Sequence, residues 1–139
     1  MTAPAHEQGT KAALVLVDHG SRCAQANSVV EDCARSLAEN GRGRYVGVYA
    51  AHMELAAPSI EQAFEAAAAA GAELVVVVLF FLAPGRHSSQ DVPRLAAEAA
   101  ARHPGLRHVI TRPLGPDPVL DDLVLLRVRE ALAAGPLDR

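Results

Sequence analysis

Residues 73–81 read ELVVVVLFF, and this stretch indicates the fold more clearly than any other in the chain. A nearly continuous apolar run rich in β-branched residues is typical of a strand covered on both faces, as in a parallel sheet between helices. The longest uninterrupted apolar run, Leu74–Ala83, is too short to cross a bilayer, so we interpret it as a core strand. A loop and a helical pattern over Val92–Arg102 follow it.

The same alternation of strand and helix recurs on both sides of this stretch. The other predicted strands are Ala12–Val17, Arg44–Ala51 and His108–Thr111. The other predicted helices are Ala24–Asn40, a segment from about Ser59 to the alanine tract before Gly71, and Val119–Ala134. Alternation with buried-type strands predicts an α/β fold. We expect a parallel sheet of about four strands with helices on both faces, a three-layer architecture of the flavodoxin-like kind.

Length and composition favour one soluble domain. The 139 residues fit a single domain over 12–134, with a disordered tail at 1–11 and a second short tail at 135–139. The net charge of -3 provides no general basic field, so neither nucleic acid nor a membrane is an expected partner. Cys23 and Cys33 have no metal-type spacing, and no signal peptide pattern is present, which favours the reducing cytoplasm.

Several histidines follow predicted strands. Ligands of open parallel sheets bind outside the carboxyl ends of the strands. His19 follows the first strand, His52 and Glu54 end the second, and His87 follows the third. Residues two apart in an extended segment share a face, so we expect His52 and Glu54 side by side. The remaining histidines are placed elsewhere: His6, His103 and His108.

Further polar residues accompany these histidines at the same edge. Ser21 is placed to cap the first helix, and Gly20 permits a tight turn. Three arginines follow the first, third and fourth strands: Arg22, Arg86 and Arg112. Histidines with a carboxylate suit a divalent metal such as Fe²⁺, Co²⁺, Ni²⁺ or Zn²⁺, and they suit general-base chemistry equally well. The residues alone leave that choice open.

Each candidate also has a simple structural explanation. His19 would be a turn residue, His87 a solvated loop residue, Glu54 a surface carboxylate, and His52 a side chain bonded to a backbone carbonyl. That all of these residues are expected at one edge of the sheet nevertheless favours a functional site there. The P-loop, dinucleotide-binding and nucleophile-elbow patterns are absent. A flavodoxin-like signalling module would need an acidic cluster, whereas Asp18 is the only carboxylate at the end of the first strand.

Four stretches resemble a known family. They are LVLVDHGSRCAQAN (14–27), AHMELAAPSIEQAF (51–64), FFLAPGRHSSQDVPRLAAEAAARHPG (80–105) and PLGPDPVLDDL (113–123). In this order and spacing they resemble the short class II chelatases of the CbiX/SirB group, the sirohydrochlorin cobalt- and ferrochelatases. The resemblance runs from about Ala13 to Arg129. Asp18 departs from the pattern of many relatives, which have glycine there, although aspartate occurs in the ferrochelatase-like members.

The resemblance implies an activity and a set of site residues. It implies that His19, His87 and Glu54 approach the metal and the macrocycle centre, as both catalytic and metal-binding residues. The remaining residues of the edge would contact the substrate: Ser21, Arg22, His52, Arg86 and Arg112. The substrates would be sirohydrochlorin and Fe²⁺, with Co²⁺ next and Ni²⁺ as a further candidate, without ATP or an organic cofactor. A homodimer is expected. The alternative is a carrier that binds metal or tetrapyrrole at the same site without turnover.

Overall fold

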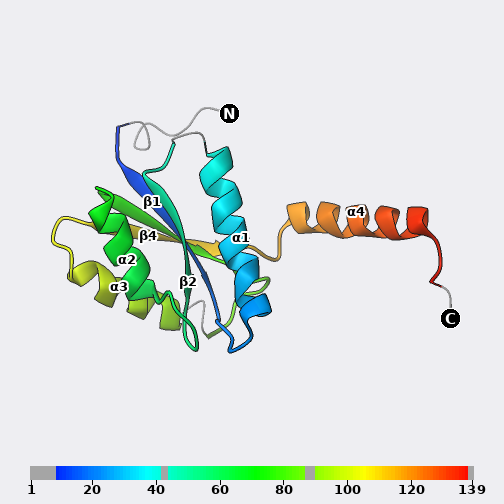
Figure 1. The fold of residues 1–139 in the computed structure, drawn as a ribbon, viewed down its shortest axis with the longest axis horizontal. Helices are drawn as coiled ribbons and strands as arrows, with labels where there is room; N and C mark the ends of the chain where they lie inside the picture. Colours follow the sequence, from blue (N-terminus) through cyan, green and yellow to red (C-terminus); the bar gives the residue numbers. More distant parts are fainter. Residues whose placement is uncertain (1–8, 42–43, 87–89, 138–139) are drawn as a thin grey trace.

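The computed structural model describes residues 9–41, 44–86 and 90–137 (Figure 1). Strands and helices alternate along the described chain: β1 (Ala12–Asp18), α1 (Ala24–Asn40), β2 (Gly47–His52), α2 (Ile60–Ala69), β3 (Leu74–Leu79), α3 (Val92–Ala101), β4 (Arg107–Pro113) and α4 (Pro118–Ala134). The strands form one parallel sheet in the order β2-β1-β3-β4. The predicted α/β class and parallel sheet are therefore confirmed.

The sheet separates two layers of helices. On one face, α2 and α3 pack on a core that includes Phe64, Val77 and Ala96. On the other face, α1 packs over β1 and β2 through Val30 and Ala34 (Figure 1). β1 lies inside the sheet between β2 and β3, so the segment that follows it enters the middle of the carboxyl edge.

Local sequence explains where the elements begin and end. α2 starts with a capping box, in which Ser59 Oγ accepts from the Gln62 N–H and Gln62 Oε1 accepts from the Ser59 N–H. α4 starts at Pro118, after Asp117 accepts from the Val119 N–H. The predicted bounds of α1 are confirmed, whereas β2 begins three residues later than predicted, at Gly47.

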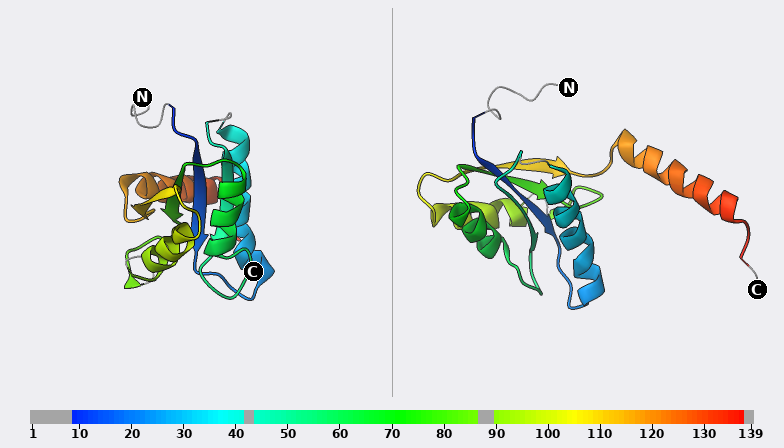
Figure 2. Two further views of the ribbon diagram at one scale, coloured as in Figure 1. Left: turned by 90° about the vertical axis from the view of Figure 1, so that its left-hand side faces the viewer. Right: turned by 45° about the horizontal axis from the view of Figure 1, so that its top comes forward.

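The fourth helix lies outside the three layers formed by α1, the sheet, and α2 with α3 (Figure 1). α4 extends away from the rest of the molecule in each view (Figures 1 and 2), and it contains no buried residue. As a result β3 is fully buried on one face only: Val75 and Val77 are buried, but Val76 and Val78 are half-buried. β1, by contrast, is covered on both faces, as its apolar run predicts: Val15, Leu16 and Val17 are all buried.

Within the described residues, none of the helices combines the length and the hydropathy that a bilayer-spanning segment requires.

Candidate functional site at the carboxyl edge of the sheet

The loops after β1 and β2 lie against each other. The Met53 N–H donates to the carbonyl of Asp18 at 2.9 Å, and the Glu54 N–H donates to the carbonyl of His19 at 3.1 Å. Gly20, with φ of 87°, packs so tightly on Glu54 that a side chain would overlap the Glu54 carbonyl oxygen. The backbones of His19 and Glu54 are therefore neighbours at the edge, and both residues are exposed.

The ring of His19 packs on an apolar neighbour. Its centroid lies 4.6 Å from that of Phe81, in an edge-on arrangement with an interplanar angle of 65°. Phe81 is buried and follows β3, so the third strand supports the histidine of the first loop. This contact restricts the imidazole orientation while the residue as a whole stays exposed.

A side chain of α1 fixes the loop that contains Ser21. Asn27 is buried, its Nδ2 donates to the Ser21 carbonyl at 2.8 Å, and its Oδ1 accepts from the Ser21 N–H at 2.9 Å. Sequence reasoning missed Asn27, and the only signal was its place in the stretch that resembles the family. The predicted helix cap is wrong: α1 begins after Cys23, and Ser21 Oγ accepts from the Cys23 N–H instead.

A buried histidine joins three elements beneath this loop. The His52 side chain is completely buried. Its Nδ1 lies 2.7 Å from a carboxylate oxygen of Asp18 in β1, and its Nε2 lies 2.8 Å from one of Glu31 in α1. A neutral imidazole has a single N–H, whereas an imidazolium donates to both carboxylates. The arrangement therefore suits a positively charged His52.

The electrostatics of His52 support the charged form. Burial by itself lowers the pKa of His52, because it disfavours the charged ring. The hydrogen bonds to Glu31 and Asp18, together with the attraction of their charges, outweigh this effect and raise the pKa above its ordinary value. Asp18 and Glu31 remain partly exposed, with side-chain exposures of 19% and 37%.

The structure corrects the role predicted for His52. We expected it to contact the substrate and to lie on the same face as Glu54. Instead β2 ends at His52, and Leu55 adopts a left-handed φ of 70°, so the extended pattern does not continue to Glu54. His52 turns inward and Glu54 is exposed. Both ring nitrogens of His52 are bonded below the surface, so the residue joins β2 to Asp18 and Glu31 and supports the loop that begins at His19.

The other predicted residues are only partly brought together. Arg22 and Arg86 are exposed in the segments that follow β1 and β3. Arg112 is also exposed, but it lies within β4, near its carboxyl end, because the strand runs two residues further than predicted. His87, the third predicted metal ligand, lies outside the described residues. Among the residues that the structure describes, no group of three or more histidine, cysteine, aspartate or glutamate side chains is placed to hold a metal. Of the three predicted metal ligands, the structure describes two, His19 and Glu54.

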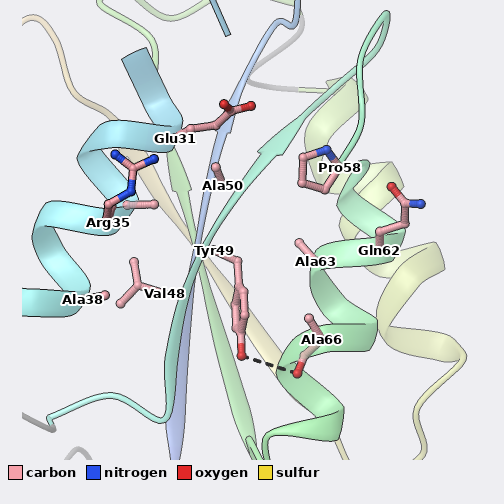
Figure 3. Close-up of a pocket in the computed structure, with 11 residues that line it drawn as sticks. Glu31, Arg35, Ala38, Val48, Tyr49, Ala50, Pro58, Gln62, Ala63 and Ala66 are labelled. Atoms are coloured by element: carbon pink, nitrogen blue, oxygen red, sulfur yellow. Dashed lines mark hydrogen bonds between the residues drawn. The ribbon is translucent and has the colours of Figure 1, made fainter. Parts of the chain in front are cut away.

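A separate groove runs along the outer edge of β2. It has a volume of about 410 Å³ and lies between α1 and α2, with Glu31 and Arg35 on one side and Gln62 on the other (Figure 3). The Tyr49 hydroxyl donates to the Ala66 carbonyl at 3.4 Å across it. None of the predicted site residues lines this groove, so it is distinct from the carboxyl edge.

Comparison with known proteins gives the family. The sequence model of the CbiX family matches residues 13–131, which is most of the chain. This chain belongs to the CbiX family. The resemblance based on the four stretches is therefore confirmed, and the CbiX match includes both His19 and Glu54.

Curated relatives of this CbiX chain have named activities. The chain is 43% identical over 120 residues to the chloroplastic sirohydrochlorin ferrochelatase of Arabidopsis thaliana. This match covers 86% of the chain and 52% of that protein. It is 34% identical over 140 aligned positions to the sirohydrochlorin cobaltochelatase of Methanopyrus kandleri, covering 86% of the chain and 96% of that protein. The chain thus spans about half of the Arabidopsis relative and nearly all of the Methanopyrus one.

A solved structure extends the likeness to the fold. SirB from Bacillus subtilis, determined with Fe³⁺, superposes with a TM-score of 0.77 at 27% identity. The match covers 91% of this CbiX chain and 48% of SirB. The predicted chelatase-like architecture is therefore confirmed.

Proposed function

We propose that this chain is a chelatase that inserts a divalent metal into sirohydrochlorin. Fe²⁺ is the first candidate metal and Co²⁺ the second, since the relatives are named ferrochelatase and cobaltochelatase. The observation that supports this proposal is that His19 and Glu54 lie on adjacent loops at the open carboxyl edge of a CbiX fold, where the Glu54 N–H donates to the His19 carbonyl. An exposed edge suits a large, flat substrate better than an enclosed cavity does.

The chemistry requires groups that accept protons and exchange metal ligands. Insertion releases two pyrrole N–H protons and removes water from the hydrated cation. His19 is proposed to bind the incoming metal or to accept a pyrrole proton, and Glu54 to act as the second ligand or proton acceptor. His87, from the loop after β3, is proposed as the third such group. The metal is a substrate and leaves in the product.

The arginines are proposed to recognise the substrate's carboxylates. Sirohydrochlorin carries eight carboxylates, and guanidinium groups pair with carboxylates in bidentate fashion. Arg22, Arg86 and Arg112 are exposed around the edge, and we assign them this role together with Ser21. Local pairing of this kind allows a chain of net charge -3 to bind a polyanion.

Assembly and location also belong to the proposal. We propose a homodimer in the cytoplasm, with neither nucleic acid nor a membrane as a partner.

The activity is tested by incubating the purified chain and sirohydrochlorin without oxygen, with Fe²⁺, Co²⁺ and Ni²⁺ supplied separately. Absorbance spectra report metallation of the ring. We expect many metallated products per chain, formed fastest with Fe²⁺. Binding of one equivalent of tetrapyrrole or metal without metallated product would contradict the chelatase and support the alternative, a carrier that uses the same site.

A further inference from the structure

An exposed leucine follows each of the strands β2, β3 and β4. The exposed fractions are 55% for Leu55, 68% for Leu82 and 37% for Leu114. Leu55 lies in the connection after β2, Leu82 in the connection after β3, and Leu114 directly after β4. Among the described residues before α4, the other exposed leucine is Leu37. Exposed leucines are therefore concentrated at the carboxyl edge, where open parallel sheets bind their ligands.

Contacts along the edge link the connection of Leu55 to that of Leu82. Glu54, which precedes Leu55, donates its backbone N–H to the His19 carbonyl at 3.1 Å. The His19 ring in turn lies 4.6 Å, centroid to centroid, from that of Phe81, which precedes Leu82. The connections therefore follow one another in the same order as the strands β2, β1 and β3 in the sheet, with His19 in the middle.

The connection of Leu114 continues the same row. The Gly115 N–H donates to the Phe81 carbonyl at 3.3 Å, and Gly115 packs so tightly on the Leu82 carbonyl that a side chain would not fit there. The strands lie in the order β2-β1-β3-β4. Because neighbouring strands are about 4.8 Å apart, the row from the first connection to the last is about 14 Å long. This length suits a tetrapyrrole that lies across the edge.

Leu55 adopts a left-handed backbone conformation. Its φ is 70°, and it is the one described residue other than glycine with a positive φ. A leucine in this region crowds its Cβ against the backbone, whereas a glycine does not. Such strain persists where surrounding contacts impose it, and it clusters at ligand sites. A leucine that is more than half exposed at a position suited to glycine contributes little burial to the fold, which points to a role in binding.

We propose that Leu55, Leu82 and Leu114, the leucine row, contact the face of the tetrapyrrole ring and hold it beside His19. The charges of sirohydrochlorin lie on its peripheral carboxylates, whereas the conjugated ring is apolar on both faces. The edge has the complementary arrangement, because Arg86 is exposed in the connection of Leu82. Burying both apolar surfaces contributes affinity that charge pairing does not supply. This inference rests on the proposed function and adds binding residues that the resemblance does not assign.

Leu55→Gly separates binding from folding. Glycine adopts the left-handed conformation freely, so we expect a Tm that is unchanged or higher. The Kd for metal-free sirohydrochlorin, from an absorbance titration, should rise about 10-fold, because the apolar surface of one leucine is no longer covered. An unchanged Kd would overturn the role of Leu55. Loss of stability and of binding together would show that this side chain serves the fold, and would overturn the assignment as well.

Leu82→Ser tests the row without a change at a strained position. It should raise the Kd about 10-fold, and Leu114→Ser should do the same. Leu82→Met keeps an apolar side chain of similar volume and should restore wild-type binding. Leu37→Ser is the matched control, because it removes an exposed leucine from the last turn of α1, at the other end of the sheet. Serine variants at the edge that bind like this control would overturn the inference.

Salt dependence distinguishes the leucine row from the arginines. Leu82→Ser should keep the wild-type salt dependence of the Kd, because apolar burial is not screened by ions. In turnover its KM should rise with kcat preserved, as expected for contacts that are equal in the ground state and the transition state. A reduced salt dependence, or a fall in kcat at unchanged KM, would overturn the apolar role.

The leucine row and the chelatase activity fail in different ways. A wild-type chain that binds sirohydrochlorin without metallating it contradicts the chelatase, and weaker binding by the serine variants then still supports the row. Metallation by the wild type, with serine variants that bind as tightly as it does, contradicts the row alone. A wild-type chain that binds no sirohydrochlorin contradicts both.

Discussion

At the scale of the residue, His52 is the most constrained side chain of the candidate site. It lies between Asp18 of β1 and Glu31 of α1, and it ends β2, so one ring connects three elements. Asp18 is the last residue of β1 and directly precedes His19. Its hydrogen bond with His52 therefore fixes the position from which the loop containing His19 starts. Asp18 therefore has a structural role through its hydrogen bond with His52.

His52→Gln should lower the free energy of unfolding more at low pH than at high pH. The pKa of His52 is raised in the folded chain above its unfolded value of about 6.5. Its contribution is therefore complete below about pH 6.5 and is lost as the pH rises through the folded pKa. Urea unfolding at about pH 6 should give a loss on the order of 2 kcal/mol, and the loss should shrink by about pH 9.

The control for this prediction is Asp32→Asn. Asp32 belongs to an exposed ion pair with Arg35 on the same helix, and exposed pairs contribute about 0.5 kcal/mol or less. A cost of His52→Gln that grows with pH would show that the ring is neutral in the folded chain.

His19→Ala should slow metal insertion without preventing tetrapyrrole binding. Loss of a positioned proton acceptor or ligand costs about 100-fold or more in rate, while recognition of the substrate's carboxylates is assigned to the arginines. The measurement is single-turnover absorbance together with a sirohydrochlorin titration. His103→Ala, in the turn after α3, is the matched control. Wild-type insertion rates for His19→Ala would remove His19 from the proposed mechanism.

At the scale of the element, the first turn of α1 is bonded to the loop that contains His19 and Ser21 through the side-chain amide of Asn27. Asn27 bonds both the N–H and the carbonyl of Ser21, so helix and loop form a single unit. The capping box of α2 joins Ser59 and Gln62, three positions apart, and is a known sequence pattern. The hydrogen bonds between Asn27 and Ser21 join residues six positions apart, and no standard sequence pattern predicts them.

Asn27→Ala should destabilise the chain and disturb the site together. It leaves the partly buried N–H and carbonyl of Ser21 without this partner, at a cost of about 1–3 kcal/mol. Ser28→Ala is the control, because its hydroxyl donates only within the helix, to the Gln25 carbonyl. Thermal unfolding and insertion rates are measured on both variants. Equal effects would show that Asn27 contributes no more than an ordinary helix residue.

At the scale of the whole molecule, positive charge gathers at one edge of the sheet although the net charge of the chain is negative. The chain is mildly acidic, yet Arg22, Arg86 and Arg112 are exposed in segments at one edge of the sheet. Apolar surface is also unevenly distributed: among the described residues, one face of β3 and β4 is only partly covered, with Val76 half-buried and Val109 exposed. Both features depend on how the elements are arranged, and neither follows from the average composition.

Arg22→Gln and Arg112→Gln should each weaken sirohydrochlorin binding about two- to five-fold, as expected for exposed ion pairs. Each variant should also reduce the salt dependence of the Kd, because screening acts on the pairs that remain. Arg94→Gln, in an exposed pair with Glu98 on α3, is the control and should leave the Kd unchanged. Arginine variants that behave like the control would place the carboxylate contacts elsewhere.

The sequence by itself determined the order of strands and helices, the parallel class of the sheet and the family. These depend on apolar runs, turn residues and motifs, which are local in the chain. Only the tertiary structure decided the role of His52, since its partners lie 34 and 21 positions away. It also decided that Ser21 is held by Asn27 and that α4 leaves the sheet. Each of these depends on which distant atoms share one place and compete for the same hydrogen bonds or the same buried surface, and periodicity carries no information about that.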